Sequence, residues 1–413
     1  MKQFFRLMAA LFLSLALSLA GLVPPAAARG KAPERIPTIL ISIDGLRPDY
    51  ISPALTPNLA AIAAKGVSGT MTPSFPSITF PNHWTLATGL RPDRHGIING
   101  AMSDPAHPGV IFGKSSEQPW WWDGSGGPVH VEPIWVAAER AHIRSGIMFW
   151  PGSTTAIDGT RASDWQAYHA DLPNHERAEV VLDWMRRPAN IRPGLALLYF
   201  GDVDVNGHRH GPGSPETIAA IRDVDAAIGY LRRGLATMHR RVNMVIVSDH
   251  GMAHTIPDHV IWLKDYVAKE DYALVSYGGI LFINNVPGHE AKLAESLKKM
   301  PGFIHCWRKG ELPERFHYGH NPRVPDWLCL PDPGARIMDG NPEHPDDGGD
   351  HGYDPASPDM RALFLATGPA FRPGTHLPVF DNVAIEPLLR RLIGLAPGKD
   401  RDGTAAPVAK ALR

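Results

Sequence analysis

Aspartate and histidine side chains follow three short apolar runs of the sequence. Asp249 and His250 stand directly after one run, and Asp204 and His208 stand four residues apart just beyond another. Asp44 ends a third run. Carboxylates and imidazoles without a nearby thiolate suit zinc best, with manganese or iron as alternatives. Each residue alone could serve a hydrogen-bonded turn or a helix cap, but together they predict a metal site.

His351 adds an imidazole ahead of a fourth apolar run. We therefore expect six ligands from separate parts of the chain to converge: Asp44, Asp204, His208, Asp249, His250 and His351. Two cations about 4 Å apart hold both the attacking and the departing oxygen of a phosphoryl group. The residue types thus predict a two-metal site for phosphoryl transfer.

Thr79 is the candidate nucleophile. Pro81 suits the first turn of a helix, because the N–H that proline lacks would have no partner there. Thr79 then lies at or just before the helix N-terminus, where free N–H groups and the helix dipole attract phosphate. A threonine hydroxyl bound to a metal ionises readily and attacks phosphorus. The alternative, that Thr79 is only an N-cap, stays open on this segment alone.

Four short apolar runs must position these groups: 38–43, 195–200, 244–248 and 362–366. Continuous apolar runs without alternation are typical of strands in a parallel sheet whose two faces are both covered. Between Pro215 and His239, apolar residues recur at three- and four-residue steps, which predicts an amphipathic helix. Strand–helix alternation indicates the α/β class, with functional groups beyond the carboxyl ends of the strands.

The pattern of apolar runs and amphipathic segments gives way to a different composition from about residue 256 to 345. This stretch contains a predicted helix near 290–299 and is otherwise rich in proline and tryptophan. We interpret it as an inserted smaller subdomain that flanks the site. Cys306 and Cys329, the two cysteines of the chain, fall within it. They could form a disulfide in an oxidising compartment, but the sequence does not supply their geometry.

The amino terminus predicts export. Lys2 and Arg6 precede an apolar run that leads into three alanines, a pattern typical of a secretory signal peptide over residues 1–28. The alternative is a membrane anchor, which the alanine-rich end of the run disfavours. No later segment is apolar enough to span a membrane. We therefore expect a periplasmic or secreted protein formed by residues 29–413.

The overall composition argues against one class of partner. The 413 residues carry 41 lysines and arginines against 42 acidic residues, which gives a formal net charge of −1. Such a near-neutral charge provides no electrostatic basis for a surface that wraps nucleic acid. The composition indicates no oligomeric state.

Six blocks of the sequence resemble the nucleotide pyrophosphatase/phosphodiesterase family, which belongs to the alkaline phosphatase superfamily. They occur in the family's order between about residues 37 and 392: 43–48, 79–83, 88–92, 95–97, 248–252 and 351–353. The blocks that contain Thr79 and Asp249 are the most specific. The chain is thus similar to a bacterial secreted member of the family. The resemblance implies an alkaline-phosphatase-like α/β/α sandwich with a mostly parallel central sheet and an inserted subdomain at about 256–345.

The resemblance also implies a division of labour among the site residues. Asp44, Thr79, Asp249 and His250 would bind one zinc ion, and Asp204, His208 and His351 would bind the other. Thr79 would attack the phosphorus of a diester, and water activated at the second zinc would hydrolyse the phospho-threonine. The backbone N–H of Phe80 would hold a phosphate oxygen. The Phe80 ring and Tyr199 would flank a leaving nucleoside base.

One position departs from the family pattern. Members usually carry two asparagines after the His-Gly-Ile block, and the second binds a phosphate oxygen through its side chain. Here the pair is Asn99 and Gly100, so that donor is missing unless another group replaces it. Loss of one oxyanion donor typically lowers the rate by about 10²–10³.

The leading hypothesis is a two-zinc phosphodiesterase or nucleotide pyrophosphatase that hydrolyses small-molecule nucleotides or other phosphodiesters. The alternatives are a phosphonate or phosphomonoester hydrolase of the same superfamily, or a non-catalytic periplasmic protein that binds metal or nucleotide. A sulfatase is disfavoured, because neither cysteine stands in a Cys-x-Pro-x-Arg context. A protein that only binds needs no nucleophile, so Thr79 favours an enzyme.

Overall fold

The computed structural model describes residues 35–113, 115–125, 127–340 and 348–413. Ile36–Arg413 forms one compact unit. The predicted signal peptide, residues 1–28, lies outside the described ranges. Within these ranges, every helix is too short or too polar to cross a bilayer.

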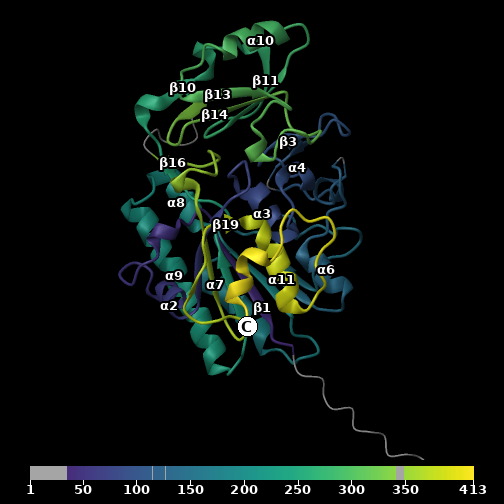
Figure 1. The fold of residues 1–413 in the computed structure, drawn as a ribbon, viewed down its shortest axis with the longest axis vertical. Helices are drawn as coiled ribbons and strands as arrows, with labels where there is room; N and C mark the ends of the chain where they lie inside the picture. Colours follow the sequence, from purple (N-terminus) through teal and green to yellow (C-terminus); the bar gives the residue numbers. More distant parts are fainter. Residues whose placement is uncertain (1–34, 114, 126, 341–347) are drawn as a thin grey trace, which may run out of the picture. The chain divides into compact units, whose positions relative to one another are not determined.

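A central sheet of nine described strands runs through the unit (Figure 1). Its order is β18 (Thr375–His376), β2 (Val67–Thr72), β17 (Ala362–Thr367), β8 (Asn243–Val247), β1 (Thr38–Ile43), β7 (Leu195–Phe200), β5 (Ser145–Met148) and β6 (Asp164–Gln166), with β19 (Phe380–Asp381) paired to β2. The four apolar runs are therefore confirmed as strands β1, β7, β8 and β17. Every pairing is parallel except those of β17, which runs antiparallel to β2 and β8.

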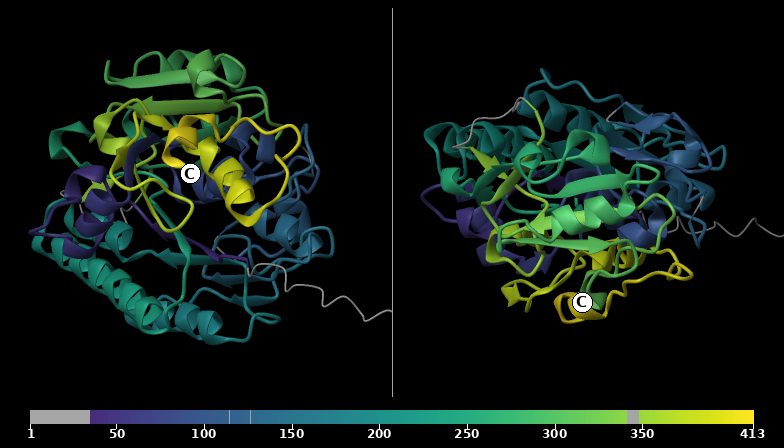
Figure 2. Two further views of the ribbon diagram at one scale, coloured as in Figure 1. Left: turned by 60° about the horizontal axis from the view of Figure 1, so that its bottom comes forward. Right: turned by 90° about the horizontal axis from the view of Figure 1, so that it is seen from above.

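Two layers of helices cover the faces of this sheet, as an apolar strand with no exposed side requires. All six residues of β1 are buried, and alternate side chains enter different cores. Ile39 and Ile41 pack with helices α2 (Pro57–Lys65), α7 (Asn174–Arg186) and α9 (Pro215–Thr237). Leu40 packs with helices α3 (Thr79–Thr88), α6 (Ile134–Arg140) and α11 (Ile385–Ile393). Figures 1 and 2 show the resulting α/β/α sandwich, and the predicted fold class is confirmed.

Helix α9 illustrates how local sequence sets an element. Ser214 precedes it, and its hydroxyl accepts a hydrogen bond from the Thr217 N–H, which satisfies one free donor of the first turn. Pro215 occupies the first helical position, where proline is favoured. Its buried apolar residues include Ile221, Ile228 and Leu235, in one stripe that faces the sheet. The amphipathic helix predicted from the sequence is therefore confirmed.

A smaller antiparallel sheet is built from residues within the predicted inserted subdomain (Figure 1). Its order is β11 (Tyr272–Ser276), β12 (Leu281–Asn285), β14 (Trp327–Pro331) and β13 (Ile304–Arg308), and helix α10 (Glu290–Leu297) packs against it. Cys306 and Cys329 face each other on β13 and β14 and form a disulfide. The pairing that the sequence left open is thus present. The independence of residues 256–345 as a subdomain stays a prediction, and residues 341–345 of this stretch lie outside the described ranges.

Shorter α-helices and strand pairs lie between these elements, beside several short 3-10 helices such as Pro48–Tyr50 and Ala406–Ala411. The α-helices and strand pairs are α4 (Pro92–His95), α5 (Pro119–Trp122) and α8 (Asp202–His210), the hairpin β3 (Met102–Ser103) with β4 (Ile111–Phe112), and two further strand pairs, β9 (Ala253–His254) with β16 (Gly349–Asp350) and β10 (Val260–Trp262) with β15 (Arg336–Met338).

The antiparallel direction of β17 decides which loops reach the functional edge of the sheet. Phe364 of β17 pairs with Val247 at the carboxyl end of β8. The amino end of β17 therefore lies beside the carboxyl ends of the parallel strands. Two backbone hydrogen bonds connect the segment after β8 to the chain around the start of β17. The Gly251 N–H donates to the Met360 carbonyl, and the Ser248 N–H donates to the Leu363 carbonyl. Segment 348–361, which precedes β17, is thus placed at this edge.

Candidate metal centre

The structure brings together all seven residues that the sequence singled out as metal ligands or nucleophile. Asp44, Asp249 and His250 follow strands β1 and β8, Asp204 and His208 lie on α8 after β7, His351 follows β16, and Thr79 begins α3. Within this set, Asp44, Asp249 and His250 offer ligand atoms within 4.8 Å of one another, and so do Asp204, His250 and His351. The residues that follow β1, β7 and β8 converge because the carboxyl ends of parallel strands share one edge of the sheet.

One group of ligand atoms surrounds the Nε2 atom of His250. That nitrogen lies 3.4 Å from Asp44 Oδ1, 3.1 Å from Asp249 Oδ2 and 3.2 Å from Thr79 Oγ1. Ligands at 2.0–2.2 Å from a tetrahedral zinc ion lie about 3.3–3.6 Å from one another. The observed spacing is therefore close to that of a metal-binding set.

A second group centres on Asp204. Its Oδ1 atom lies 3.6 Å from His208 Nε2 and 3.5 Å from His351 Nε2. The two groups adjoin, because the His250 and His351 rings stack with their centroids 3.8 Å apart. His250 belongs to both groups of ligand atoms that lie within 4.8 Å of one another, so the assignment of each residue to one of two metals stays a prediction.

Three carboxylate oxygens support a cationic occupant. Asp44 Oδ1, Asp204 Oδ1 and Asp249 Oδ2 are buried and have no hydrogen-bond donor among the described residues. These are the atoms that face the histidine nitrogens. A buried carboxylate oxygen without a donor is unfavourable by about 1–3 kcal/mol or more, and a metal ion removes that penalty. The donor set of carboxylate oxygens and imidazole nitrogens therefore fits zinc.

Backbone contacts orient the three imidazoles of the candidate site. Each Nδ1 lies near a carbonyl oxygen: His208 at 3.0 Å from Gly349, His250 at 2.9 Å from Gly251, and His351 at 2.9 Å from Ser77. A carbonyl oxygen only accepts, so Nδ1 carries the hydrogen in each ring. Nε2 is then the ring atom that faces the carboxylates, as metal ligation requires.

The electrostatics of the site also call for positive charge. Burial, reinforced by the carboxylates of Asp249 and Asp204, raises the pKa of Asp44 well above its usual value. Burial also disfavours ionisation of Asp249, but the rings of His250 and His83 hold its pKa below the usual range. A cation between Asp44 and Asp249 would allow both carboxylates to stay ionised.

Thr79 occupies the first helical position of α3 rather than the N-cap. The N-cap is Ile78, which has extended backbone angles and supplies no side-chain cap. The Thr79 hydroxyl instead lies 3.2 Å from His250 Nε2. The cap interpretation therefore loses its support, and the hydroxyl belongs to the cluster of ligand atoms.

Tyr199 makes a contact that the sequence did not predict. Its hydroxyl donates a hydrogen bond of 2.6 Å to Asp44 Oδ2, the oxygen that faces away from His250. Its ring packs edge-on against His83, with centroids 5.2 Å apart. The Phe80 ring is half-buried, 5.8 Å from the ring of Phe112. The stacking of Phe80 and Tyr199 on a nucleoside base stays a prediction.

Sequence reasoning missed His83 as a member of the site. Its ring is fully buried, and its Nδ1 donates to the Thr79 carbonyl at 2.9 Å and lies 3.3 Å from Asp249 Oδ2. The Ser42 hydroxyl holds the other ring nitrogen at 2.9 Å. His83 therefore links the backbone of the nucleophile to a candidate ligand. Its position four residues after Thr79 on a helix was the signal that could have revealed it.

Tyr168 is a second residue that the sequence did not single out. Its side chain is 55% exposed, and its ring centroid lies 6.0 Å from that of Tyr199. Burial of its hydroxyl end and the nearby carboxylates, including Asp44, raise the pKa of Tyr168. An exposed aromatic ring beside the metal centre is a suitable surface for a substrate ring. No periodic or motif signal marks it in the sequence.

The structure also defines the space around Gly100. Its backbone is outside the left-handed region, and a Cβ atom there would meet only Ile78 Cγ2, at 3.9 Å. The side chain of Asn99 turns elsewhere, because its amide nitrogen donates to Ser276 Oγ at 2.7 Å. Its oxygen accepts from the Gly100 N–H. Neither strain nor crowding therefore prevents an asparagine at position 100.

Comparisons with known sequences agree with this geometry. The sequence pattern of the type I phosphodiesterase/nucleotide pyrophosphatase family matches residues 38–354. An uncharacterized pyrophosphatase/phosphodiesterase of Schizosaccharomyces pombe is 37% identical over 388 residues, which cover 89% of this chain and 78% of that protein. Ectonucleotide pyrophosphatase/phosphodiesterase family member 1 of Rattus norvegicus is 32% identical over 393 residues. The chain covers 89% of its own length there but spans only 42% of the rat protein.

Solved structures show the same similarity in three dimensions. Murine ectonucleotide pyrophosphatase/phosphodiesterase 5 superposes with a TM-score of 0.85 at 31% identity, over 91% of this chain and 100% of that one. An inactive threonine-to-alanine variant of the same murine protein, solved in complex with AMP, also gives a TM-score of 0.85, over 92% of this chain and 100% of that one.

Proposed function

Because the chain belongs to the type I phosphodiesterase/nucleotide pyrophosphatase family, we propose that it is a two-zinc hydrolase of phosphodiester or pyrophosphate bonds in nucleotides. One observation carries the proposal: three buried carboxylate oxygens without donors face imidazole nitrogens beside the Thr79 hydroxyl. The AMP complex of the murine relative supports a nucleotide as the substrate class.

The candidate ligands divide into two sets. Asp44, Thr79, Asp249 and His250 would hold one zinc ion, and Asp204, His208 and His351 would hold the other. Bound zinc would lower the pKa of the Thr79 hydroxyl and stabilise negative charge on the attacking and departing oxygens. Manganese or iron is a lesser alternative for the same ligands.

Thr79 would act as the nucleophile in two balanced steps. Its Oγ1 forms a bond to phosphorus while the bond from phosphorus to the departing oxygen breaks, and the hydroxyl proton passes to solvent. Water then attacks the phospho-threonine, the bond between phosphorus and Thr79 breaks, and Thr79 regains a proton. His83 would hold the Thr79 backbone during both steps. The inactive threonine-to-alanine variant of the murine relative supports a threonine in this role.

The surroundings of Thr79 suggest how substrate is held and where the protein works. The Phe80 N–H at the second position of α3 would bind a phosphate oxygen. The rings of Phe80 and Tyr199 would flank a nucleoside base, and the exposed ring of Tyr168 beside Tyr199 would extend that surface. The disulfide between Cys306 and Cys329, together with the predicted signal peptide, supports a periplasmic or secreted location.

Substitution of Thr79 tests the proposed nucleophile. Thr79→Ala should fold and bind metal, yet lose nearly all hydrolysis of a nitrophenyl nucleotide diester, because the covalent step has no other hydroxyl at this point. Thr79→Ser is the matched control, and it should retain part of the turnover because it keeps the hydroxyl. Activity of Thr79→Ala above about a tenth of wild type would favour direct attack by water instead.

Metal depletion tests the two-zinc site itself. Dialysis against a chelator should remove two zinc ions per chain and abolish turnover, and added zinc should restore both. Elemental analysis of the protein before and after dialysis provides the stoichiometry. Full activity after complete metal removal, or a stoichiometry of one, would contradict the proposal.

A further inference from the structure

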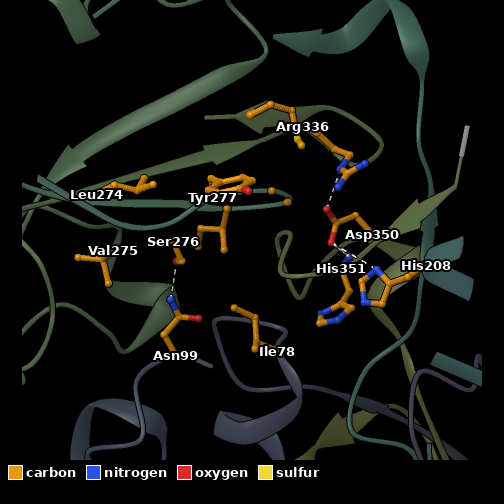
Figure 3. Close-up of a pocket in the computed structure, with 14 residues that line it drawn as sticks. Ile78, Asn99, His208, Leu274, Val275, Ser276, Tyr277, Arg336, Asp350 and His351 are labelled. Carbon is orange, nitrogen blue, oxygen red and sulfur yellow. Dashed lines mark hydrogen bonds and ion pairs between the residues drawn. The ribbon is translucent and has the colours of Figure 1, made fainter. Parts of the chain in front are cut away.

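A cavity of about 440 Å³ opens beside the metal centre (Figure 3). His208 and His351 form one end of it, and Leu274 and Val275 of β11 line the opposite end. The cavity therefore extends from the second ligand set towards the smaller sheet. Its volume lies within the range of pockets that bind ligands of nucleoside size.

The walls of the cavity come from two parts of the chain that a hydrogen bond joins. Ile78 and Asn99 belong to the segments around the start of α3 and before β3, and Ser276 belongs to β11. Asn99 Nδ2 donates to Ser276 Oγ at 2.7 Å, so the side chains that line this part of the cavity are held together. Apolar side chains, among them Val275 and Met338, form much of the remaining wall.

The charges in the wall compensate each other. Arg336 is the one lysine or arginine among the described lining residues, and its Nε lies 2.9 Å from Asp350 Oδ2. Both side chains are almost fully buried, and the pair contributes no net positive charge to the cavity. In the proposed site, the zinc ion held by Asp204, His208 and His351 would compensate the departing oxygen. The remaining charges of pyrophosphate would lie farther along a wall whose one arginine is paired with Asp350, and transfer of an anion into such surroundings is unfavourable.

The position of the cavity relative to Thr79 indicates which part of a substrate it would receive. The argument rests on the proposed function, in which Thr79 attacks from the side of Asp44 and Asp249. In an in-line displacement the departing oxygen lies opposite the nucleophile, at the second metal of the pair. That side is marked by His208 and His351, which also border the cavity.

We propose that this cavity holds the leaving group, and that it selects phosphodiesters whose leaving group is an uncharged alcohol with an apolar or aromatic body. Pyrophosphate is disfavoured as a leaving group because the Arg336–Asp350 pair supplies no net positive charge to bind it. The enzyme is then a phosphodiesterase in preference to a hydrolase of nucleoside triphosphates.

Two substrates with the same retained half test the proposal. Thymidine 5′-monophosphate p-nitrophenyl ester releases an uncharged ring, whereas thymidine triphosphate releases pyrophosphate. Val275→Lys places a cation in the cavity, and Val275→Met is an uncharged control of similar length. In the zinc-loaded enzyme, Val275→Lys should lower the ratio of kcat/KM values, ester over triphosphate, by at least about 10-fold. Val275→Met should leave that ratio within about twofold of wild type.

The ratio removes intrinsic differences between the two leaving groups, because each variant is compared with wild type on both substrates. If Val275→Lys fails to fold, Leu274→Lys with Leu274→Met provides the same comparison from the neighbouring half-buried position. An equal change for both substrates would mean that the cavity holds the shared nucleoside half, and would overturn the inference. So would an unchanged ratio. If wild type with zinc hydrolyses neither substrate, the proposed function itself fails.

Discussion

Removal of a single hydroxyl, in Tyr199→Phe, should weaken one of the two proposed metal sites. The Tyr199 hydroxyl donates a 2.6 Å hydrogen bond to Asp44 Oδ2, while Asp44 Oδ1 faces His250. Burial and the carboxylates of Asp249 and Asp204 raise the pKa of Asp44, and the hydrogen bond from Tyr199 opposes that rise. Loss of the hydroxyl thus makes the charged form of a proposed ligand less favourable.

The size of the effect follows from the type of bond that is lost. A hydrogen bond to a charged group contributes about 1.5–3 kcal/mol, which corresponds to a factor of about 10–100 in zinc affinity. Substitution of outer partners of metal ligands typically has an effect of that order. Only the set of Asp44, Thr79, Asp249 and His250 should weaken, so one zinc of two should become easier to remove. The loss should grow as the pH falls, because a higher pKa of Asp44 lets protons compete with the metal.

Chelator competition measures this directly. Zinc content is followed against increasing chelator at several pH values, with circular dichroism to check the fold. Tyr168→Phe is the matched control, because the same hydroxyl is removed from an exposed ring near the site that has no bond to Asp44. Equal zinc retention in Tyr199→Phe and wild type at every pH would refute the reasoning, and would leave Tyr199 with a packing role only.

Three further predictions follow from the same structure. Gly100→Asn should raise kcat and kcat/KM for a nucleotide diester by about 10-fold or more, because the new amide has room beside Ile78 to donate to a phosphate oxygen. An unchanged or lower kcat in the fully metallated variant would mean that another donor already binds that oxygen, and Asn99 would be the first to examine. The double variant Cys306→Ser/Cys329→Ser should have a free energy of unfolding in denaturant about 3 kcal/mol below that of wild type, the loop-entropy estimate for a separation of 23 residues. Wild type with a reduced disulfide is the control and should show an equal loss. No loss in either protein would contradict the estimate. Burial lowers the pKa of His95 to about 3, and its Nδ1 accepts a hydrogen bond from the Ile97 N–H. Because the imidazole of the unfolded chain binds a proton below about pH 6.5, the free energy of unfolding should fall by up to about 5 kcal/mol between pH 6.5 and 3. The melting temperature of His95→Gln should depend less on pH than that of wild type, and an identical slope would assign the acid sensitivity to other groups.

The strands and the chemistry of their ends could be predicted from local sequence. Six consecutive buried residues in β1 produce a continuous apolar run, and such a run is visible without any knowledge of its partners. Carboxylates after β1, β7 and β8 must then meet, because parallel strands end at one edge. Asp44, Asp204 and Asp249 were therefore found from the sequence, as was Thr79 at the start of a helix marked by Pro81.

The contribution of His351 required more than the local pattern. It precedes β17, and it reaches the metal centre because that strand runs antiparallel to its neighbours. Strand direction depends on the path of the connecting segments, and an apolar run looks the same in either direction. In the sequence, His351 was predicted as a ligand because it precedes a fourth apolar run, while the physical reason for its position came from the fold.

The contacts that hold the site were decided by tertiary structure alone. The hydrogen bond from Tyr199 to Asp44 joins residues 155 positions apart, and the disulfide depends on the register of β13 against β14. The wall of the cavity likewise includes a contact between Asn99 and Ser276, which lies 177 residues later in the chain. Residue type and periodicity report which groups a chain can offer and which face of an element is buried. Contacts between distant segments are set by the packing of whole elements, so the sequence by itself determined which candidate metal ligands the chain offers, and the fold decided which side chains contact them.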